Sequence, residues 1–376
     1  MVGPLAGVKV LEVAGIGPGP FAAMLLADMG AQVTRLDRPG PVREAERYVM
    51  HRGRRSIVID LKHSYGVGVA LDLVESNDIL LEGNRPGVME RLGLGPMDCH
   101  ARNQRLVYGR MTGWGQDGPL AAAAGHDIDY IAVSGALGIA ARQGERPVPP
   151  VNLVGDFGGG GAFLAIGVLA ALWEAAKSGH GQVVDAAMID GSAVLTTMIY
   201  GLMAQGRWRD EPGTNFADTG SPYYEVYRCA DGRDVAVGAL EAKFYASLVE
   251  GLGFEAASLP DRTDPTNWAV LKSMFAERFA ARPRDEWIEH FDGIDACVSP
   301  VLSLEEATRH PHALARGTFT VHHGINQPSP APRFSRTPSV LDRAPPQPGA
   351  HTDDILCELG YSAVKIASLR SASAVH

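Results

Sequence analysis

The chain has 376 residues, enough for two domains, and its 45% hydrophobic and 20% charged residues are typical of a soluble globular protein. Its formal net charge of −9 argues against a nucleic-acid binder, which usually carries a basic domain or stripe. The four cysteines are scattered without metal-ligand spacing, so we expect a reduced, cytoplasmic protein with no bound metal.

The chain also lacks the usual sequence signals for export or membrane insertion. The stretch MVGPLAGVKVLEV has no charged region followed by an apolar block, so no signal peptide is expected. The most apolar run, residues 162–173, is too short to span a bilayer and suits a buried core helix. We therefore expect no membrane partner.

The first half of the chain alternates the patterns of buried strands and helices. Strands are predicted over residues 8–13, 31–37, 56–61, 78–83, 105–111 and 182–190, and helices over 20–30, 65–77, 157–176 and 191–206. Strands separated by helices indicate crossover connections, which join parallel strands. The predicted fold class is therefore α/β, with a parallel sheet.

The sequence changes character after about residue 205. A loop-rich stretch leads to a hairpin predicted around Asp231 and Gly232, and helices are predicted over 241–253, 266–281 and 284–291. These patterns favour a second, smaller domain of α+β type.

The last part of the chain is predicted to contain little regular structure. The proline-rich residues 325–350 predict an extended connector, residues 351–362 a final helix, and residues 367–376 a frayed end. We place the large domain at 1–205, completed by about 326–360, the small domain at 218–318, and extended linkers at 206–217 and 319–345.

The pattern GPGPFA at residues 17–22 is similar to a dinucleotide-binding turn, since it lies between a strand and a helix and Asp37 follows 20 residues after Gly17. Pyrophosphate in such a turn is held by backbone N–H groups. Pro18 and Pro20 remove two of those groups. The pattern therefore favours a tight turn that lets helix and strand pack closely, rather than a nicotinamide or flavin site.

Basic residues recur beside the ends of the predicted strands, although the protein is acidic overall. Guanidinium groups bind phosphates in bidentate fashion, and parallel sheets bind ligands at the carboxyl ends of their strands. A solvated loop charge is the plain alternative for any single residue, but the group favours a phosphorylated ligand. The basic candidates are Arg38, Arg52, Lys62, Arg85 and Arg91, with Arg54 and Arg55 beside Arg52 in HRGRRS.

Two segments carry residue types suited to proton transfer. Asp156, in NLVGDFGGGG, is predicted to cap the following helix, which aspartate often does for structural reasons alone. Gly158–Gly161 weaken a helix, which predicts a close approach to their backbone and free N–H groups that stabilise an anion. His126, in AGHDIDY, is a candidate base with Glu241 as its partner, although a lone histidine is more often structural. Tyr130 and Gly155 are candidate substrate contacts.

Several motifs together resemble the family III CoA-transferase superfamily, and within it the α-methylacyl-CoA racemases. They are GPGPFAAMLLADMGAQVTRLDRPG, RLGLGP, RMTGWGQDGP, AGHDIDY, NLVGDFGGGG, GQVVDAAMIDGS, ADGRDVAVGALEAKFY and APRFSRTPS, spread over about residues 2–340. The resemblance implies a Rossmann-like large domain, a small domain and an interlocked homodimer. It also implies an active site between one subunit's large domain and the other's small domain.

By the same resemblance, His126 and Asp156 are the two bases, Glu241 is the partner of His126, and Arg38 and Arg91 bind CoA. The expected reaction interconverts (R)- and (S)-2-methylacyl-CoA thioesters in fatty acid metabolism, with no cofactor besides the CoA of the substrate. Removal of a proton beside a thioester needs a base and stabilisation of the enolate oxygen. Racemisation also needs a proton-carrying group on each face of the enolate.

Two other functions stay open. A CoA transferase of the same fold would use Asp156 as a nucleophile. Such enzymes carry a glycine run before the small-domain hairpin, where this chain has NFADTGSPYYEVY. A non-enzymatic CoA-binding protein would have kept the pocket and lost the chemistry, which the presence of His126, Asp156 and Glu241 opposes.

Overall fold

The structure is a computed structural model that describes residues 3–40 and 48–376. The described chain divides into two compact units. Unit 1 comprises the described residues up to Ser134, then Val151–Leu195 and Gly317–His376, and unit 2 comprises Gly135–Pro150 and Thr196–Arg316. Each unit is therefore assembled from segments that are far apart in the sequence.

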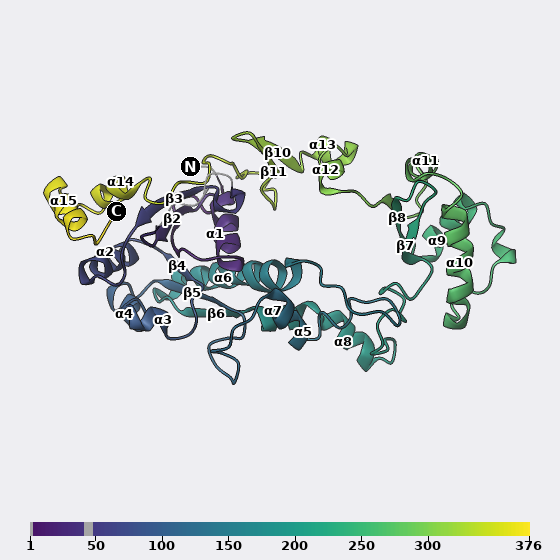
Figure 1. Cartoon of the computed structure of the whole chain (residues 1–376), viewed down its shortest axis with the longest axis horizontal. Helices are drawn as coiled ribbons and strands as arrows, with labels where there is room; N and C mark the ends of the chain where they lie inside the picture. The colour runs from purple at the N-terminus through teal and green to yellow at the C-terminus, as the bar shows by residue number, and fades with distance from the viewer. Residues whose placement is uncertain (1–2, 41–47) are drawn as a thin grey trace. The chain divides into compact units, whose positions relative to one another are not determined.

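Unit 1 is built on a six-stranded sheet in which neighbouring strands run parallel (Figure 1). Its strands are β1 (Lys9–Val13), β2 (Gln32–Asp37), β3 (Arg54–Val58), β4 (Ile79–Glu82), β5 (Val107–Thr112) and β6 (Val183–Ala187). The strand order is β3-β2-β1-β4-β5-β6, so the order reverses between β1 and β4. This topology confirms the predicted α/β class with a Rossmann-like parallel sheet.

Helices cover both faces of this sheet. They are α1 (Pro18–Asp28), α2 (Ser64–Glu75), α3 (Val88–Arg91), α4 (Pro96–Arg102), α5 (Asp127–Val133), α6 (Phe163–Ser178), α7 (Met188–Leu195), α14 (Thr352–Glu358) and α15 (Ala363–Ser371). Leu11 and Leu80 pack with residues of α2 and α14 on one face. Val10 and Ile79 pack with residues of α1 and α6 on the other. Adjacent strand residues point to opposite faces, so two apolar faces require two layers of helices.

The segment before α6 differs from the sequence expectation. A π-helix over Leu153–Ala162 continues directly into α6, so Asp156 lies inside a helical segment and not at the N-cap of a helix that begins at 157. A Cβ on Gly159 would lie 2.5 Å from the backbone nitrogen of Ser192 in α7. One on Gly161 would lie 2.6 Å from the carbonyl oxygen of Pro18 in α1. These glycines therefore admit neighbouring helices of the same chain.

The π-helix and α6 form one continuous helix, Leu153–Ser178, which by length and composition alone could cross a membrane. It is longer than the apolar run at 162–173 because the glycine-rich turns precede that run. Core helices pass the same test, and α6 buries Leu164 and Val168 in the core beside the sheet. In this structure one side of the helix packs in the core of unit 1, and 39% of its most apolar window is buried.

The C-terminal part of the chain completes unit 1. After β10 (Phe319–His322) and β11 (Ile325–Pro328), residues 329–351 contain no helix or strand, as the prolines predict. The predicted frayed end is wrong. Ile366 and Leu369 of α15 join the core beside α2, and the buried Val375 pairs with Ile59. Burial of these apolar side chains holds the last residues in place.

Unit 2 has its own sheet and its own aromatic core. β7 (Tyr224–Arg228) and β8 (Asp234–Gly238) form the hairpin predicted around Asp231 and Gly232, and β9 (Val298–Pro300) adds a third antiparallel strand. Phe275 and Trp287 are buried in its core. The helices are α8 (Thr197–Ala204), α9 (Ala242–Gly251), α10 (Trp268–Phe279), α11 (Arg284–His290), α12 (Leu304–Ala307) and α13 (Pro311–Arg316).

Gly159→Ala is expected to destabilise the protein because the new Cβ has no room between the π-helix and α7. Overpacking of this kind costs about 1–3 kcal/mol. Gly68→Ala in α2 is the matched control, since nothing lies within 4 Å of its Cβ position and alanine is the better helix former. Thermal denaturation followed by circular dichroism compares the two. A Gly159→Ala variant that melts at the wild-type temperature would contradict the close approach.

Candidate active site

A cavity of about 660 Å³ opens at the carboxyl-terminal edge of the six-stranded sheet. It lies where β1, β4 and β5 end, beside the point at which the strand order reverses, and open α/β sheets bind ligands at this place. Its polar lining includes Tyr48, Asn84, Arg85, Thr112, His126, Asp129, Tyr130, Asn152 and Asp156, and its apolar lining includes Ile16, Met50, Met111, Trp114, Phe157 and Met188. Unit 1 alone therefore brings histidine and carboxylate side chains to one cavity.

His126 is held at the start of α5 by its backbone. Its N–H donates to Asp129 Oδ2 at 2.9 Å, and its C=O accepts the N–H of Asp129. This reciprocal pair is a helix-capping arrangement that fixes the entry of the chain into α5. The imidazole itself is exposed and lines the cavity, so a core-packing role does not explain it.

Tyr130 ties the loop that carries His126 to the loop after β5. Its ring is buried edge-on against Trp114, with 4.8 Å between the ring centroids, and its hydroxyl donates to the C=O of Gly125. A Cβ on Gly113 would overlap the same ring, at 2.0 Å from Cζ. Burial raises the pKa of Tyr130, and the charge of Asp156 raises it further. Tyr130, a predicted substrate contact, lines the cavity.

Asp156 is held by two hydrogen bonds and lies close to the turn that precedes α1. Its Oδ2 accepts a hydrogen bond from Asn152 Nδ2 at 3.0 Å. Its backbone N–H donates to Oδ2 of the buried Asp127 at 2.6 Å. Gly17 precedes α1 with a φ of +67°, and a Cβ there would lie 3.3 Å from Asp156 Oδ2. The GPGPFA turn therefore lets α1 begin close to this carboxylate, which explains why glycine stands there.

Asp127 couples the two candidate bases, because it follows His126 directly and accepts the N–H of Asp156. The pKa of Asp127 is raised above its ordinary value, mainly by burial. The hydrogen bond from the N–H of Asp156 acts in the opposite direction, and the charge of Asp156 adds to the increase. The N–H of Asp156 is engaged in this hydrogen bond and is not free to stabilise an anion. A Cβ on Gly155 would lie 2.6 Å from Asp127 Oδ2, so glycine at this position lets the carboxylate approach the backbone. The role of Gly155 as a substrate contact stays a prediction.

The predicted basic residues fall into two groups, and the first lies at the cavity edge of the sheet. Arg85 lines the cavity itself. Arg38 and Lys62 are exposed and follow the carboxyl ends of β2 and β3. Arg91 ends α3, where its guanidinium lies against Gly87. All four remain candidates for binding phosphate groups.

The second group, in HRGRRS, stands at the start of β3 and has internal partners. Arg52 is buried and donates to both carboxylate oxygens of Asp28 and to Gln327 Oε1. Arg54 is fully buried and pairs with Glu12 at 2.7 Å. Because buried charges require such partners, Arg52 holds α1 and β11 together, away from the residues that line the cavity.

Glu241 belongs to unit 2, where it is the exposed residue before α9. Its pairing with His126 stays a prediction. Among the residues that the structure describes, no group of three or more His, Cys, Asp or Glu side chains could hold a metal ion. The histidine and carboxylate at the cavity suit proton transfer near neutral pH.

Three cavity residues escaped the sequence analysis. Asn152 lies four residues before Asp156, and that spacing brings two side chains together on a helix, so it was the available signal. Asn84 is positioned by its backbone N–H, which donates to the buried Glu82 Oε2 at 2.6 Å. Tyr48 lies in a loop with no pattern that singles it out.

Comparisons with known proteins show the family to which the chain belongs. The model of CoA-transferase family III matches residues 5–352. The chain is 45% identical to the alpha-methylacyl-CoA racemase of Mus musculus and 44% identical to that of Homo sapiens, each over 98% of this chain and 96% of the relative. It is 28% identical to human succinyl-CoA:glutarate CoA-transferase, over 99% of this chain and 90% of that protein. A CAIB/BAIF family protein from Brucella suis has a similar structure, with a TM-score of 0.84, 25% identity and coverage of 96% of this chain and 100% of that chain.

His51 lies behind the cavity wall, with its ring 4.7 Å from that of Tyr48. Burial, and then the charges of Arg35 and Arg54, lower the pKa of His51 from 6.5 to about 3. The unfolded chain therefore takes up a proton at a pH where the folded protein does not. His51 accordingly contributes stability that is present above about pH 6.5 and is lost as the pH falls toward about 3.

His51→Phe keeps a ring against Tyr48 and removes this titration. Its free energy of unfolding is expected to fall less steeply than that of the wild type between pH 6.5 and 3. Urea denaturation at several pH values measures the slopes, and His180→Phe, at an exposed histidine, should match the wild type. Parallel slopes for His51→Phe and wild type would contradict the lowered pKa.

Proposed function

Because this chain belongs to CoA-transferase family III, we propose that it is an α-methylacyl-CoA racemase, which interconverts (R)- and (S)-2-methylacyl-CoA thioesters. Its 44–45% identity to racemases, against 28–31% to several named CoA-transferases, favours racemisation over CoA transfer. The observation that carries the proposal is the single cavity that both His126 and Asp156 line.

The proposed reaction removes the proton from one face of the α-carbon and adds a proton to the opposite face. The thioester binds with this carbon between His126 and Asp156. In one direction, the neutral imidazole takes the α-proton and the C–H electron pair becomes part of the enolate. The protonated Asp156 carboxyl then returns a proton to the opposite face. The reverse reaction exchanges the two roles, so each turnover leaves one group protonated and one free.

The enolate oxygen needs a hydrogen-bond donor, and the donor we assign is the backbone N–H of Asp127. The N–H of Asp156 donates to Asp127 Oδ2 and cannot serve. The N–H of Asp127 is the first in α5, where no turn of the helix pairs it, and it stands next to His126. A well-placed donor of this kind contributes about 3–4 kcal/mol to stabilising the transition state.

Charged residues around the cavity support the binding of CoA. Arg38, Lys62, Arg85 and Arg91 supply positive charge for the phosphate groups, and the apolar wall with Met111 and Met188 suits an acyl chain. Glu241 would orient His126 and raise its basicity. The chemistry requires no cofactor besides the CoA of the substrate.

We assign the active form to an interlocked homodimer in the cytoplasm, acting in fatty acid metabolism. Large apolar side chains stay exposed on α6 and α7 of unit 1, and burial of exposed apolar side chains favours association. They are Ile166, Trp173, Val194 and Leu195. A partner subunit would then supply the Glu241 that faces His126.

His126→Ala and Asp156→Ala are each expected to reduce turnover by at least ~100-fold, as loss of a general acid or base does. His180→Ala is the control, since this exposed histidine precedes the amino end of β6 at the opposite edge of the sheet. Rates are measured from the change in optical rotation of a single 2-methylacyl-CoA enantiomer, on variants whose melting temperatures match the wild type. Near-wild-type turnover in either variant would remove that residue from its assigned role.

Turnover in deuterated water is expected to place deuterium at the α-carbon of both enantiomers, because each proton passes through a side chain that exchanges with solvent. Mass spectrometry of the recovered thioester measures the label. A second carboxylic acid added to the same mixture should receive no CoA. Transfer of CoA to that acid without loss of optical purity would instead assign Asp156 the role of a nucleophile.

A further inference from the structure

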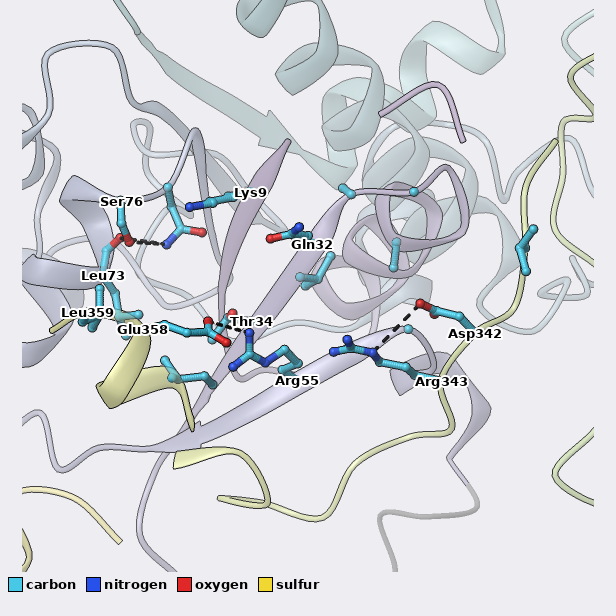
Figure 2. Close-up of a pocket in the computed structure, with 18 residues that line it drawn as sticks. Lys9, Gln32, Thr34, Arg55, Leu73, Ser76, Asp342, Arg343, Glu358 and Leu359 are labelled. Atoms are coloured by element: carbon cyan, nitrogen blue, oxygen red, sulfur yellow. Dashed lines mark hydrogen bonds and ion pairs between the residues drawn. The ribbon is translucent and has the colours of Figure 1, made fainter. Parts of the chain in front are cut away.

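A second cavity of about 660 Å³ opens at the amino-terminal edge of the sheet, opposite the active-site cavity (Figure 2). It is bordered by the starts of β1, β2 and β3, the end of α2, α14, and the connector near Arg343. All of these belong to unit 1. The two cavities share no lining residue, so the second is a separate place on the molecule.

The register of the strands explains why this cavity is polar. Val13, Leu36 and Ile57 form a row of apolar partners across β1, β2 and β3, beneath the helices of that face. Two residues earlier on each strand, the same face carries Leu11, Thr34 and Arg55, and Lys9 pairs with Gln32 beyond them. The apolar face thus becomes polar and cationic toward its amino-terminal edge.

Positive side chains outnumber negative side chains in the lining of this cavity. Arg55 pairs with Glu358 at 2.7 Å, whereas the carboxylate nearest to Arg343 is its neighbour Asp342, at 4.0 Å. No ion pair to Lys9 occurs among the residues that the structure describes. Three cationic side chains therefore face two carboxylates, in a protein whose net charge is −9.

The carboxylate of Glu358 lies close enough to all three positive charges for each of them to affect its pKa. Its pKa is lowered by the hydrogen bond from Arg55 and by the charges of Arg55, Lys9 and Arg343. Figure 2 shows Arg55 directed at Glu358 and Arg343 extending from the connector on the other side of the cavity. The Glu358 side chain is 63% exposed, so an incoming anion can take its place beside Arg55 at little cost.

The segments that carry these side chains are fixed by a backbone hydrogen bond and by packing in the hydrophobic core. The N–H of Gly53 donates to the C=O of Arg343 at 3.0 Å, which fixes the connector to the start of β3. Leu73 of α2 and Ile355 of α14 line the cavity and are buried in the core. A ligand would therefore meet a preformed site with an apolar wall beside its cations.

We propose that this cavity is a second binding site, for a small phosphate-bearing anion held by Lys9, Arg55 and Arg343 in place of Glu358. Guanidinium groups offer paired donors to phosphate oxygens, and an ammonium adds a compact positive charge. The site is independent of the racemase activity proposed above, because it stands on residues of the opposite edge of the sheet.

Isothermal titration of the full chain with inorganic pyrophosphate tests this proposal. Lys9→Gln and Arg343→Gln are each expected to weaken binding about tenfold, since each loses a charge-assisted hydrogen bond. Glu358→Gln is expected to tighten binding, because it removes the carboxylate that competes for Arg55. Arg309→Gln, at an exposed arginine of unit 2, is the matched control for the loss of one positive charge and should bind like the wild type.

Tighter pyrophosphate binding by Glu358→Gln can be observed only if that variant is folded, so misfolding cannot produce this result. The proposal is overturned if pyrophosphate does not bind, or if Lys9→Gln and Arg343→Gln bind it like the wild type. It is also overturned if Arg309→Gln weakens binding as much as Arg343→Gln, which would indicate non-specific attraction. Loss of binding in Arg85→Gln, with Arg343→Gln unaffected, would place the anion in the active-site cavity instead.

Discussion

One hydrogen bond, from the N–H of Asp156 to the carboxylate of Asp127, sets the geometry of the active site. The segment between these residues, Gly135–Pro150, belongs to unit 2, so the chain leaves unit 1 between its two bases and then returns. Closing such a loop costs conformational entropy, and a partly buried hydrogen bond to a carboxylate at its base offsets part of that cost. The bond thereby keeps His126 and Asp156 at one cavity.

Close contacts between backbones make this bond possible. The π-helix passes so near to α7 and α1 that Gly159 and Gly161 have no room for a side chain. The carboxylate of Asp127 occupies the place that a side chain at Gly155 would take. The position of the Asp156 carboxylate is therefore determined by packed backbone and not by a flexible loop. A site fixed in this way needs little reorganisation when charge develops during the reaction.

Periodicity in the sequence was enough to predict the parallel sheet and to place the ligand site at its carboxyl edge, because parallel strands all end on one side. His126 and Arg85, which line the cavity, could be singled out because they stand in loops that follow strands or begin helices, whereas Asp156 was singled out as a helix cap but lies inside the π-helix. The partners of Arg52, Asp28 and Gln327, are distant in the sequence, so no local pattern indicated that its guanidinium is engaged inside unit 1. The Asp127–Asp156 bond and the π-helix depend on tertiary packing, which no local pattern encodes. α15 was missed because Ile366 and Leu369 stand in a polar stretch and gain their apolar surroundings only in the folded chain.

The order of segments in unit 1 also has a consequence for protein synthesis. The face of the sheet that carries Leu11, Leu36 and Ile57 is covered in part by α14 and α15, which are translated after unit 2. A nascent chain therefore holds a sheet face that only α2 and its neighbours cover while residues 196–316 of unit 2 are being translated, and apolar surface exposed in this way promotes aggregation. A message truncated before codon 352 would produce a chain whose core never closes, and proteases would remove it.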